Sequence, residues 1–172
     1  DAFHLVPRVL NYFVTGADFT VALGVGKLVT SITMTVFYVL VYYIYLEYFH
    51  KVENKQATIC VWTLAVFRIA LCLFPQNGWL TNQSSTAWGV IRNVPFVILG
   101  CLIVILYFQE SKEPSRLKWV WLLVALSFLF YIPVAVAAGI VPMLGMLMLP
   151  KTICYILLIV LFRQAVLKDE VA

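Results

Sequence analysis

The residues best suited to chemistry in this chain are four basic side chains inside long apolar segments: Lys27, Arg68, Arg92 and Lys151. The only acid in those segments is Glu47, at the far end of the first one. A charge in hydrocarbon is costly, so intramembrane lysines and arginines usually face a bundle interior or a water-filled cavity and have a partner there. Because the segments supply almost no anion, we expect the partner to be an anionic ligand, a lipid headgroup or a group on another protein.

The elements that must position these side chains are membrane-spanning helices. The chain has 172 residues, of which 63% are hydrophobic and 12% charged, whereas soluble domains are about half apolar and about a quarter charged. A helix needs about 20 apolar residues to cross a bilayer, and no segment alternates polar and apolar residues as a barrel strand does. The sequence therefore predicts an all-α integral membrane protein, a bundle of five transmembrane helices at residues 21–48, 57–75, 88–108, 118–139 and 142–163.

The basic residues of the loops predict how these helices are oriented. Seven of them fall on one predicted side of the membrane, and apart from the four intramembrane cations only Arg8 falls on the other. Basic loops face the cytoplasm, so we expect the C-terminus in the cytoplasm and residue 1 outside the cell. The seven residues are Lys51, Lys55, Lys112, Arg116, Lys118, Arg163 and Lys168.

Both ends of the chain lie outside the predicted helical bundle, which covers residues 21–166. Residues 1–20 mix polar and large apolar side chains, which indicates an extracellular or interfacial segment. Residues 167–172 form a predicted cytoplasmic tail. An outer end that starts with Asp1 is compatible with an upstream signal peptide, an upstream span or trimming, and of these we favour a sixth span before residue 1.

The four cations fall in the predicted outer half of the bilayer or close to its middle. At about 1.5 Å per residue, Lys27 lies about 9 Å below the outer end of its span, Arg68 about 10 Å and Arg92 about 6 Å. Lys151 is the deepest, at about 14 Å by the same rise. Glu47 lies at the inner surface, too far away to pair with any of them. This arrangement predicts an outward-facing cationic cavity.

Amide and hydroxyl side chains at comparable depths extend the predicted site. The predicted ligand-binding residues are Lys151, Arg68, Arg92, Lys27, Asn93, Tyr131, Ser127 and Thr152. Prolines interrupt three of the spans, at Pro95, Pro133 and Pro150, and are expected to kink them because each removes a helical hydrogen bond. Kinked helices beside intramembrane charges recur in the binding sites of transporters.

Simpler interpretations of the same cations stay open. Lys27 and Arg92 are shallow enough to reach the outer headgroups and to bind lipid phosphate only. Snorkelling of this kind is harder for Arg68 and Lys151, which are deeper. We therefore expect Arg68 and Lys151, the deeper pair, to matter more for function than Lys27 and Arg92.

Catalytic, metal and cofactor chemistry has little support in the sequence. Membrane enzymes rely on Asp, Glu, His or Ser–His groups at membrane depth, but His4 and His50 fall on opposite predicted faces and cannot share a metal or haem. Lys151 resembles the retinal-bearing lysine of rhodopsins in its place on the last helix, yet Leu147 stands one turn earlier, where a microbial rhodopsin would carry an acid. The formal charge of +4 is scattered, unlike a nucleic-acid surface. We therefore expect no enzymatic activity, metal, cofactor or nucleic acid.

Three stretches resemble segments of uncharacterised bacterial multi-span membrane proteins, namely residues 145–152 (GMLMLPKT), 92–96 (RNVPF) and 30–35 (TSITMT). This resemblance implies a bacterial cell membrane and brings no activity with it. In size and hydrophobicity the chain is also similar to the substrate-capturing subunits of energy-coupling vitamin transporters. Their alanines spaced by three are not evident in the first span, so the likeness is one of architecture only.

Two functions follow from these patterns. In the first, the chain binds or transports a small anionic or amphiphilic ligand through the cationic cavity, as a transport protein or receptor. In the second, it is a membrane sensor or accessory subunit whose basic residues pair with a partner protein or with lipid headgroups. Membrane lipid surrounds the chain in both cases.

Overall fold

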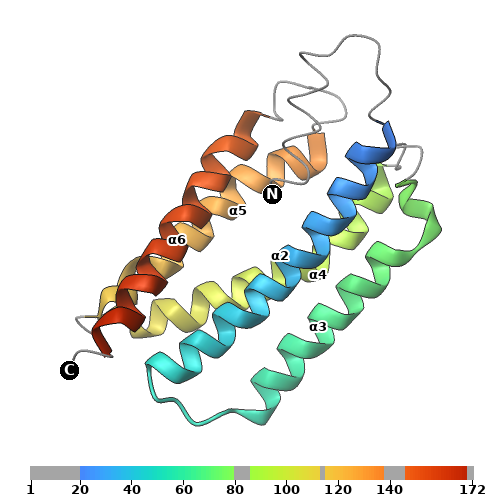
Figure 1. Ribbon diagram of the computed structural model, residues 1–172. Coiled ribbons are helices and arrows are strands. Elements are labelled where there is room, and N and C mark those ends of the chain that lie inside the picture. The colour runs from blue at the N-terminus through green and yellow to red at the C-terminus, as the bar shows by residue number, and fades with distance from the viewer. Residues whose placement is uncertain (1–19, 80–85, 113–114, 138–145, 170–172) are drawn as a thin grey trace. The chain divides into compact units, whose positions relative to one another are not determined.

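The computed structural model describes residues 20–79, 86–112, 115–137 and 146–169, and this part of the chain contains helices and no strand (Figure 1). Five helices are long and apolar enough to cross a membrane. The prediction of an all-α chain with five long apolar helices is thereby confirmed. The elements are α2 (Thr20–Tyr48), α3 (Lys55–Leu73), η1 (Pro75–Asn77), α4 (Thr86–Gln109), η2 (Glu110–Lys112), η3 (Arg116–Trp119), α5 (Val120–Ala137) and α6 (Met148–Asp169).

The first three long helices begin and end within two residues of the predicted spans at 21–48, 57–75 and 88–108. The segment predicted at 1–20 lies, except for its last residue, outside the described residues, and so does the predicted turn between the last two spans. The hydropathy of the chain therefore located these helices closely.

The largest differences from the predicted spans lie at the two ends of the last helix, which continues to Asp169 although the span was predicted to end at residue 163 and the tail to begin at residue 167. α6 begins at Met148, whereas the span was expected from residue 142. Pro150 therefore lies in the first turn of α6, where a missing N–H costs no helical hydrogen bond. The prediction of a kink at Pro150 is wrong for this reason. Lys151 likewise lies in the first turn of the described helix.

The other two prolines lie inside helices, as predicted. Pro95 is within α4 and Pro133 is within α5. Proline has no N–H, so each removes the helical hydrogen bond to the carbonyl four residues earlier, at Ile91 and Leu129.

Local side-chain chemistry sets both ends of α3. Asn54 precedes the helix in an extended conformation, and its side-chain oxygen accepts the backbone N–H of Gln56 at 3.0 Å, as N-cap residues do. At the other end Phe74 is extended, the conformation favoured before a proline. Gly78 closes the short helix η1 with φ 56°, a left-handed conformation that glycine adopts at little cost. These residues stop α3 and turn the chain.

The chain divides into two compact units, and the first comprises Asp1–Leu40 and Glu53–Phe96. Its described helices are the first part of α2, all of α3 and the first half of α4. Fully or nearly fully buried side chains of its core include Tyr38, Val61 and Phe96. We call this part unit 1.

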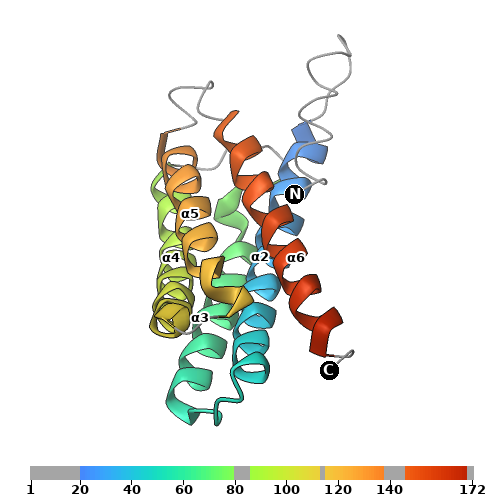
Figure 2. The same ribbon diagram turned by 90° about the vertical axis from the view of Figure 1, so that its left-hand side faces the viewer.

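The second unit, unit 2, comprises Val41–Val52 and Val97–Ala172. It contains the end of α2, the second half of α4, and the helices α5 and α6. Helices α5 and α6 pack against each other and run in opposite directions (Figures 1 and 2). Its buried core is aliphatic and aromatic, with Leu99, Ile103, Tyr107, Val124 and Leu158 among its members.

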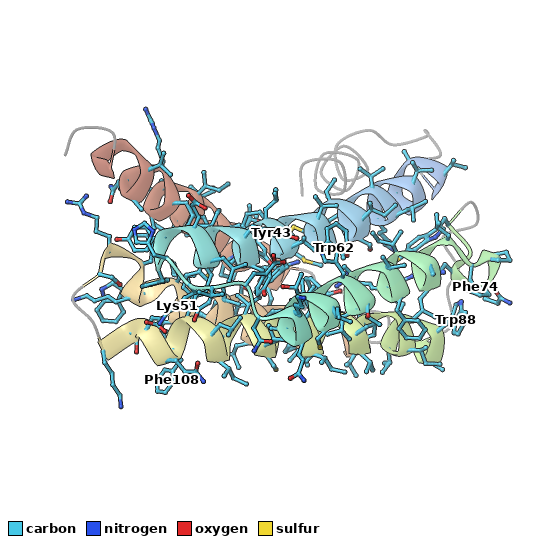
Figure 3. The ribbon with its side chains drawn as sticks, turned by 90° about the horizontal axis from the view of Figure 1, so that it is seen from below. Tyr43, Lys51, Trp62, Phe74, Trp88 and Phe108 are labelled. Carbon is cyan, nitrogen blue, oxygen red and sulfur yellow. The ribbon has the colours of Figure 1, made fainter. Side chains whose placement is uncertain are left out.

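An ion pair joins two connecting segments of unit 2. The Lys51 Nζ atom lies 2.9 Å from a carboxylate oxygen of Glu110, and the Tyr45 hydroxyl donates to the same oxygen at 3.4 Å. Lys51 follows the end of α2 and is labelled in Figure 3. The Tyr107 ring packs edge-on against Tyr45 at 5.4 Å between centroids, and its hydroxyl donates to the Val41 carbonyl at 3.0 Å. The ion pair is thus connected to a cluster of aromatic side chains through Tyr45.

Removing the Glu110 charge is expected to have a small effect. Glu110→Gln should lower the unfolding free energy by about 0.5 kcal/mol, since partly exposed ion pairs contribute little, and the Lys51 side chain is 44% exposed. The difference should shrink as salt rises. Thermal melting in detergent at low and high sodium chloride measures it, with the exposed neighbour Lys112→Gln as a control. A loss above about 2 kcal/mol that salt does not change would contradict this expectation.

Candidate functional site

Arg68 lies on the buried face of α3 in unit 1. The buried residues of this helix are Val61, Ala65, Arg68, Leu71 and Cys72, which recur at helical spacing along one stripe. The Arg68 side chain is 2% exposed, so the arginine takes a place that an apolar residue would normally fill. An arginine in that position needs a nearby group that interacts well with a cation.

The face of Phe96, on α4, supplies that interaction. The guanidinium carbon of Arg68 lies 3.4 Å from the centroid of the Phe96 ring, and the Tyr38 ring of α2 packs edge-on against the same phenylalanine at 5.1 Å. A desolvated cation–π contact contributes about 2 kcal/mol, which offsets part of the cost of burying the charge.

Arg92 is bound to the end of α3 through Asn77. Its Nη1 atom donates to the Asn77 side-chain oxygen at 2.8 Å, and its guanidinium lies 4.4 Å from the Trp79 ring. The Asn77 amide nitrogen donates in turn to the carbonyls of Leu71 at 2.7 Å, Phe74 at 2.9 Å and Cys72 at 3.2 Å. These are carbonyls at the C-terminal end of a helix, where partial negative charge accumulates and a cation is favoured.

The indole of Trp79 completes this arrangement by donating to the Cys72 carbonyl at 2.7 Å. We call Asn77, Trp79 and Arg92 the turn cluster. At the same end of unit 1 the rings of Phe74 and Trp88 pack edge-on at 6.0 Å between centroids, and both are labelled in Figure 3. Arg92 therefore fixes a helix end, a structural role that the sequence-based interpretations did not include.

Asn77 and Trp79 were missed by reasoning from the sequence. Asn77 is 1% exposed although it lies in a connecting segment. A signal was present, because an Asn-Gly pair shortly after a proline is typical of a tight turn. Hydropathy gave no indication that this turn would also receive an arginine from α4.

Lys27, on α2 in unit 1, is part-buried. The polar residues that follow it on the same helix form hydrogen bonds within that helix. Ser31 Oγ donates to the Lys27 carbonyl at 2.8 Å, and Thr35 Oγ1 donates to the Ser31 carbonyl at 2.8 Å. Serine and threonine commonly satisfy their hydroxyls in this way, so these two do not by themselves indicate a ligand.

Lys151 is the buried cation of unit 2. It is 3% exposed, and its Nζ atom lies 4.3 Å from the Tyr131 ring and 5.5 Å from the Tyr155 ring. Tyr131 comes from α5 and Tyr155 from α6, so the antiparallel packing of these helices builds the aromatic surroundings. Lys151 and Tyr131, which were both among the predicted ligand-binding residues, are thus in direct contact.

The three remaining predicted residues bond to their own helices. The Asn93 amide donates to the Gly89 carbonyl at 2.8 Å, the Ser127 hydroxyl to Val124 at 2.8 Å and the Thr152 hydroxyl to Met148 at 2.8 Å. Asn93 and Ser127 are buried. Of the eight predicted residues, Lys27, Arg68, Arg92 and Asn93 belong to unit 1, and Lys151, Thr152, Ser127 and Tyr131 belong to unit 2.

Within the described ranges, no three His, Cys, Asp or Glu side chains are grouped so that they could hold a metal ion. The four cysteines are free thiols, and Cys60 and Cys101 are exposed while Cys72 and Cys154 are buried. Among the described residues, the candidate functional groups are therefore cations that lie against aromatic rings.

Comparison with known proteins adds no relative to this picture: no protein-family model matches the chain, and neither a curated protein nor a solved structure matches it.

Proposed function

We propose that this chain is a multi-pass membrane protein that binds or transports a small anionic or amphiphilic ligand through its buried cations. The observation that carries the proposal is that Arg68 and Lys151, the two cations with 2% and 3% exposure, both lie on aromatic rings. The rings hold each cation in an apolar setting, where a ligand of the opposite charge would interact with it favourably.

The composition of the helices supports this proposal. The sequences of α3 and α4 contain basic residues and no acidic residue. A positive charge kept at low dielectric attracts an anion far more strongly than the same charge in water. An anionic ligand would therefore gain much of its binding free energy at such a site.

The proposed orientation places the ligand on the outer side of the membrane. It rests on basic residues near helix ends that share one side if every long helix spans. These residues are Lys51 after α2, Lys55 at the start of α3, Arg116 before α5 and Arg163 in the last two turns of α6. In that orientation the first turn of α6, with Lys151, lies towards the outer side, and the C-terminus is cytoplasmic.

The alternative of a sensor or accessory subunit is less well supported by the buried cations. An acid on a partner protein pairs with a cation that is accessible at the surface of the chain, and neither Arg68 nor Lys151 meets that condition. Lys27 and Arg92 are more exposed and could reach a partner or a headgroup. We therefore propose ligand binding at the buried cations, Arg68 in unit 1 and Lys151 in unit 2, each within its own unit.

Lys151→Ala is expected to weaken binding of an anionic amphiphile by at least about tenfold, because bonds to charged groups contribute about 1.5–3 kcal/mol. The test is thermal melting of the purified chain in neutral detergent with octanoate, octyl phosphate or neutral octanol. The anions should raise the melting temperature of the wild type, whereas octanol should not.

The matched control is Arg163→Ala, which removes an exposed positive charge from the other end of α6 and should leave the response intact. If no anion stabilises the wild type and the chain instead purifies with a stoichiometric membrane partner, the proposal falls in favour of the accessory subunit.

A further inference from the structure

We propose that the end of unit 2 built by η2 and η3 is a docking surface for the headgroups of anionic phospholipids. This surface, which we call the η3 surface, consists of Lys112, Arg116, Lys118 and Trp119. The inference rests on the membrane arrangement of the proposed function and uses nothing about the ligand of the buried cations. It therefore gives exposed basic residues of the chain a role of their own.

Two fully buried side chains fix the orientation of η3. Leu117 in η3 and Val120, the first residue of α5, are each 0% exposed. They are three residues apart, which is one turn of a 3-10 helix, so both side chains leave the same side of it. Arg116, Lys118 and Trp119 are exposed. The turn thus has one side in the core of unit 2 and presents two cations and an indole to its surroundings.

Neighbouring elements of unit 2 hold η3 in place. It packs against η2 and α6, and Figure 1 shows the end of α4, the start of α5 and the end of α6 at one end of this unit. The Arg116 Nη1 atom donates to the backbone carbonyl of Gln164, on α6, at 3.5 Å. A carbonyl is neutral, so this contact positions the guanidinium without cancelling its charge.

The charge of this segment is positive. Residues 111–119 contain three basic residues and one acid, Glu113, which lies outside the described residues. The Glu110 carboxylate lies 2.9 Å from Lys51, so a lysine outside the η3 surface balances that acid. Basic residues immediately beside a membrane-spanning helix attract anionic headgroups. The η3 surface carries its cations in that position.

Aromatic side chains next to the cations indicate the level of the headgroups. Trp119 is 53% exposed, and the Lys118 Nζ atom lies 5.6 Å from its ring. The exposed ring of Phe108, labelled in Figure 3, packs edge-on against Trp121 at 5.1 Å between centroids. Tryptophan is enriched where a membrane meets water, because its ring is apolar and its N–H is polar. An indole beside cations suits a lipid with a charged headgroup and apolar chains.

The exposure of these cations favours a lipid over a soluble anion. An ion pair between exposed groups contributes little in water, so a free phosphate would gain little at the η3 surface. A bilayer instead supplies headgroups at a high local concentration, and its surface potential acts on several basic residues together. The partner is therefore a membrane surface that contains anionic phospholipid.

The experiment measures which lipids stay bound to the full chain, by native mass spectrometry from neutral detergent. Dioleoyl phosphatidylglycerol and dioleoyl phosphatidylcholine are supplied in equal amounts; their acyl chains are the same, so a difference reports the headgroup. The wild type should retain phosphatidylglycerol at least about tenfold better, since each basic residue near an anionic surface contributes about fivefold. Replacing two residues together, Arg116→Gln and Lys118→Gln, should bring the ratio to within about threefold.

The matched control is Lys55→Gln, which removes an exposed lysine that belongs to unit 1. It should change the ratio by less than about twofold. An effect as large as that of the double variant would show that any basic residue serves, and would overturn the η3 surface. Loss of the preference in millimolar inorganic phosphate, but not in sodium chloride of equal ionic strength, would overturn the lipid as partner.

Fluorescence quenching in vesicles locates the bound lipid and needs only a conservative variant. Brominated phosphatidylglycerol should quench the tryptophan emission of the wild type more strongly than brominated phosphatidylcholine. Trp119→Phe should remove most of that difference. Equal quenching of the wild type by the two lipids would overturn the inference even if the double variant does not fold.

The outcomes separate this inference from the proposed function. Lys151→Ala should leave the preference for phosphatidylglycerol unchanged, because Lys151 is not part of the η3 surface. If the wild type shows no preference while octanoate still stabilises it in a Lys151-dependent manner, the inference is overturned and the proposed function stands. A preference for phosphatidylglycerol in a chain that neither octanoate nor octyl phosphate stabilises supports the inference and counts against the proposed function.

Discussion

Gly24→Ala is expected to lower the unfolding free energy by about 3 kcal/mol, at the upper end of the cost of overpacking. Gly24 lies on α2, and a Cβ atom added there would overlap the backbone carbonyl of Trp79. That carbonyl cannot move easily, because the Trp79 indole is bonded to Cys72 and its ring is stacked on Arg92. Equilibrium unfolding of the detergent-solubilised chain measures the loss.

Two other glycines provide matched controls. A Cβ at Gly89 meets nothing within 4 Å, so Gly89→Ala should change stability by no more than about 1 kcal/mol. A Cβ at Gly100 would overlap the ring of Phe128, which is a side chain and can shift, so Gly100→Ala should cost an intermediate amount. Equal effects at Gly24 and Gly89 would show that α2 does not approach Trp79 this closely.

Asn77→Ala is expected to lower the free energy of unfolding by about 3 kcal/mol. It removes the hydrogen-bond acceptor of the part-buried Arg92 and the donor to several carbonyls at the end of α3. The wild-type Asn77 side chain makes hydrogen bonds to Leu71, Cys72, Phe74 and Arg92. The thermal melting temperature of the variant, read by tryptophan fluorescence, should fall, and the signal of Trp79 should change with it.

The adjacent residue offers the control for this variant. Gln76 lies in the same short helix and is exposed, so Gln76→Ala should leave the melting temperature within the range of ordinary surface substitutions, about 0.5 kcal/mol. A melting temperature for Asn77→Ala equal to that of Gln76→Ala would contradict the role assigned to the turn cluster.

The long helices could be predicted from the sequence because hydropathy is a property of consecutive residues. A run of about 20 apolar residues has few alternatives to a helix long enough to cross a bilayer. The same property could not locate the start of α6, because residues 142–148 are as apolar as the helix that follows them. Pro150 was therefore placed too deep within its helix.

The partners of the cations could not be predicted for a different reason. Helices that are apolar on every side do not reveal which face turns inward, so nothing in the sequence directed Arg68 towards Phe96, 28 residues later. The sequence also did not indicate that the contacts of Arg68, Arg92 and Lys151 include aromatic faces. Tyr131 and Lys151 were both expected at comparable depths of adjacent spans, but their direct contact was not predicted.

The contacts of the two arginines also have a consequence for how the chain enters a bilayer. Ser31, Thr35 and Ser127 satisfy their hydroxyls within their own helices, so their polarity is masked as soon as each helix forms. The contacts of Arg68 and Arg92 instead join α3, the turn after it and α4. Neither α3 nor α4 can shield its arginine alone. In the proposed membrane arrangement these two helices therefore leave the insertion machinery as a pair, with the turn cluster already closed between them.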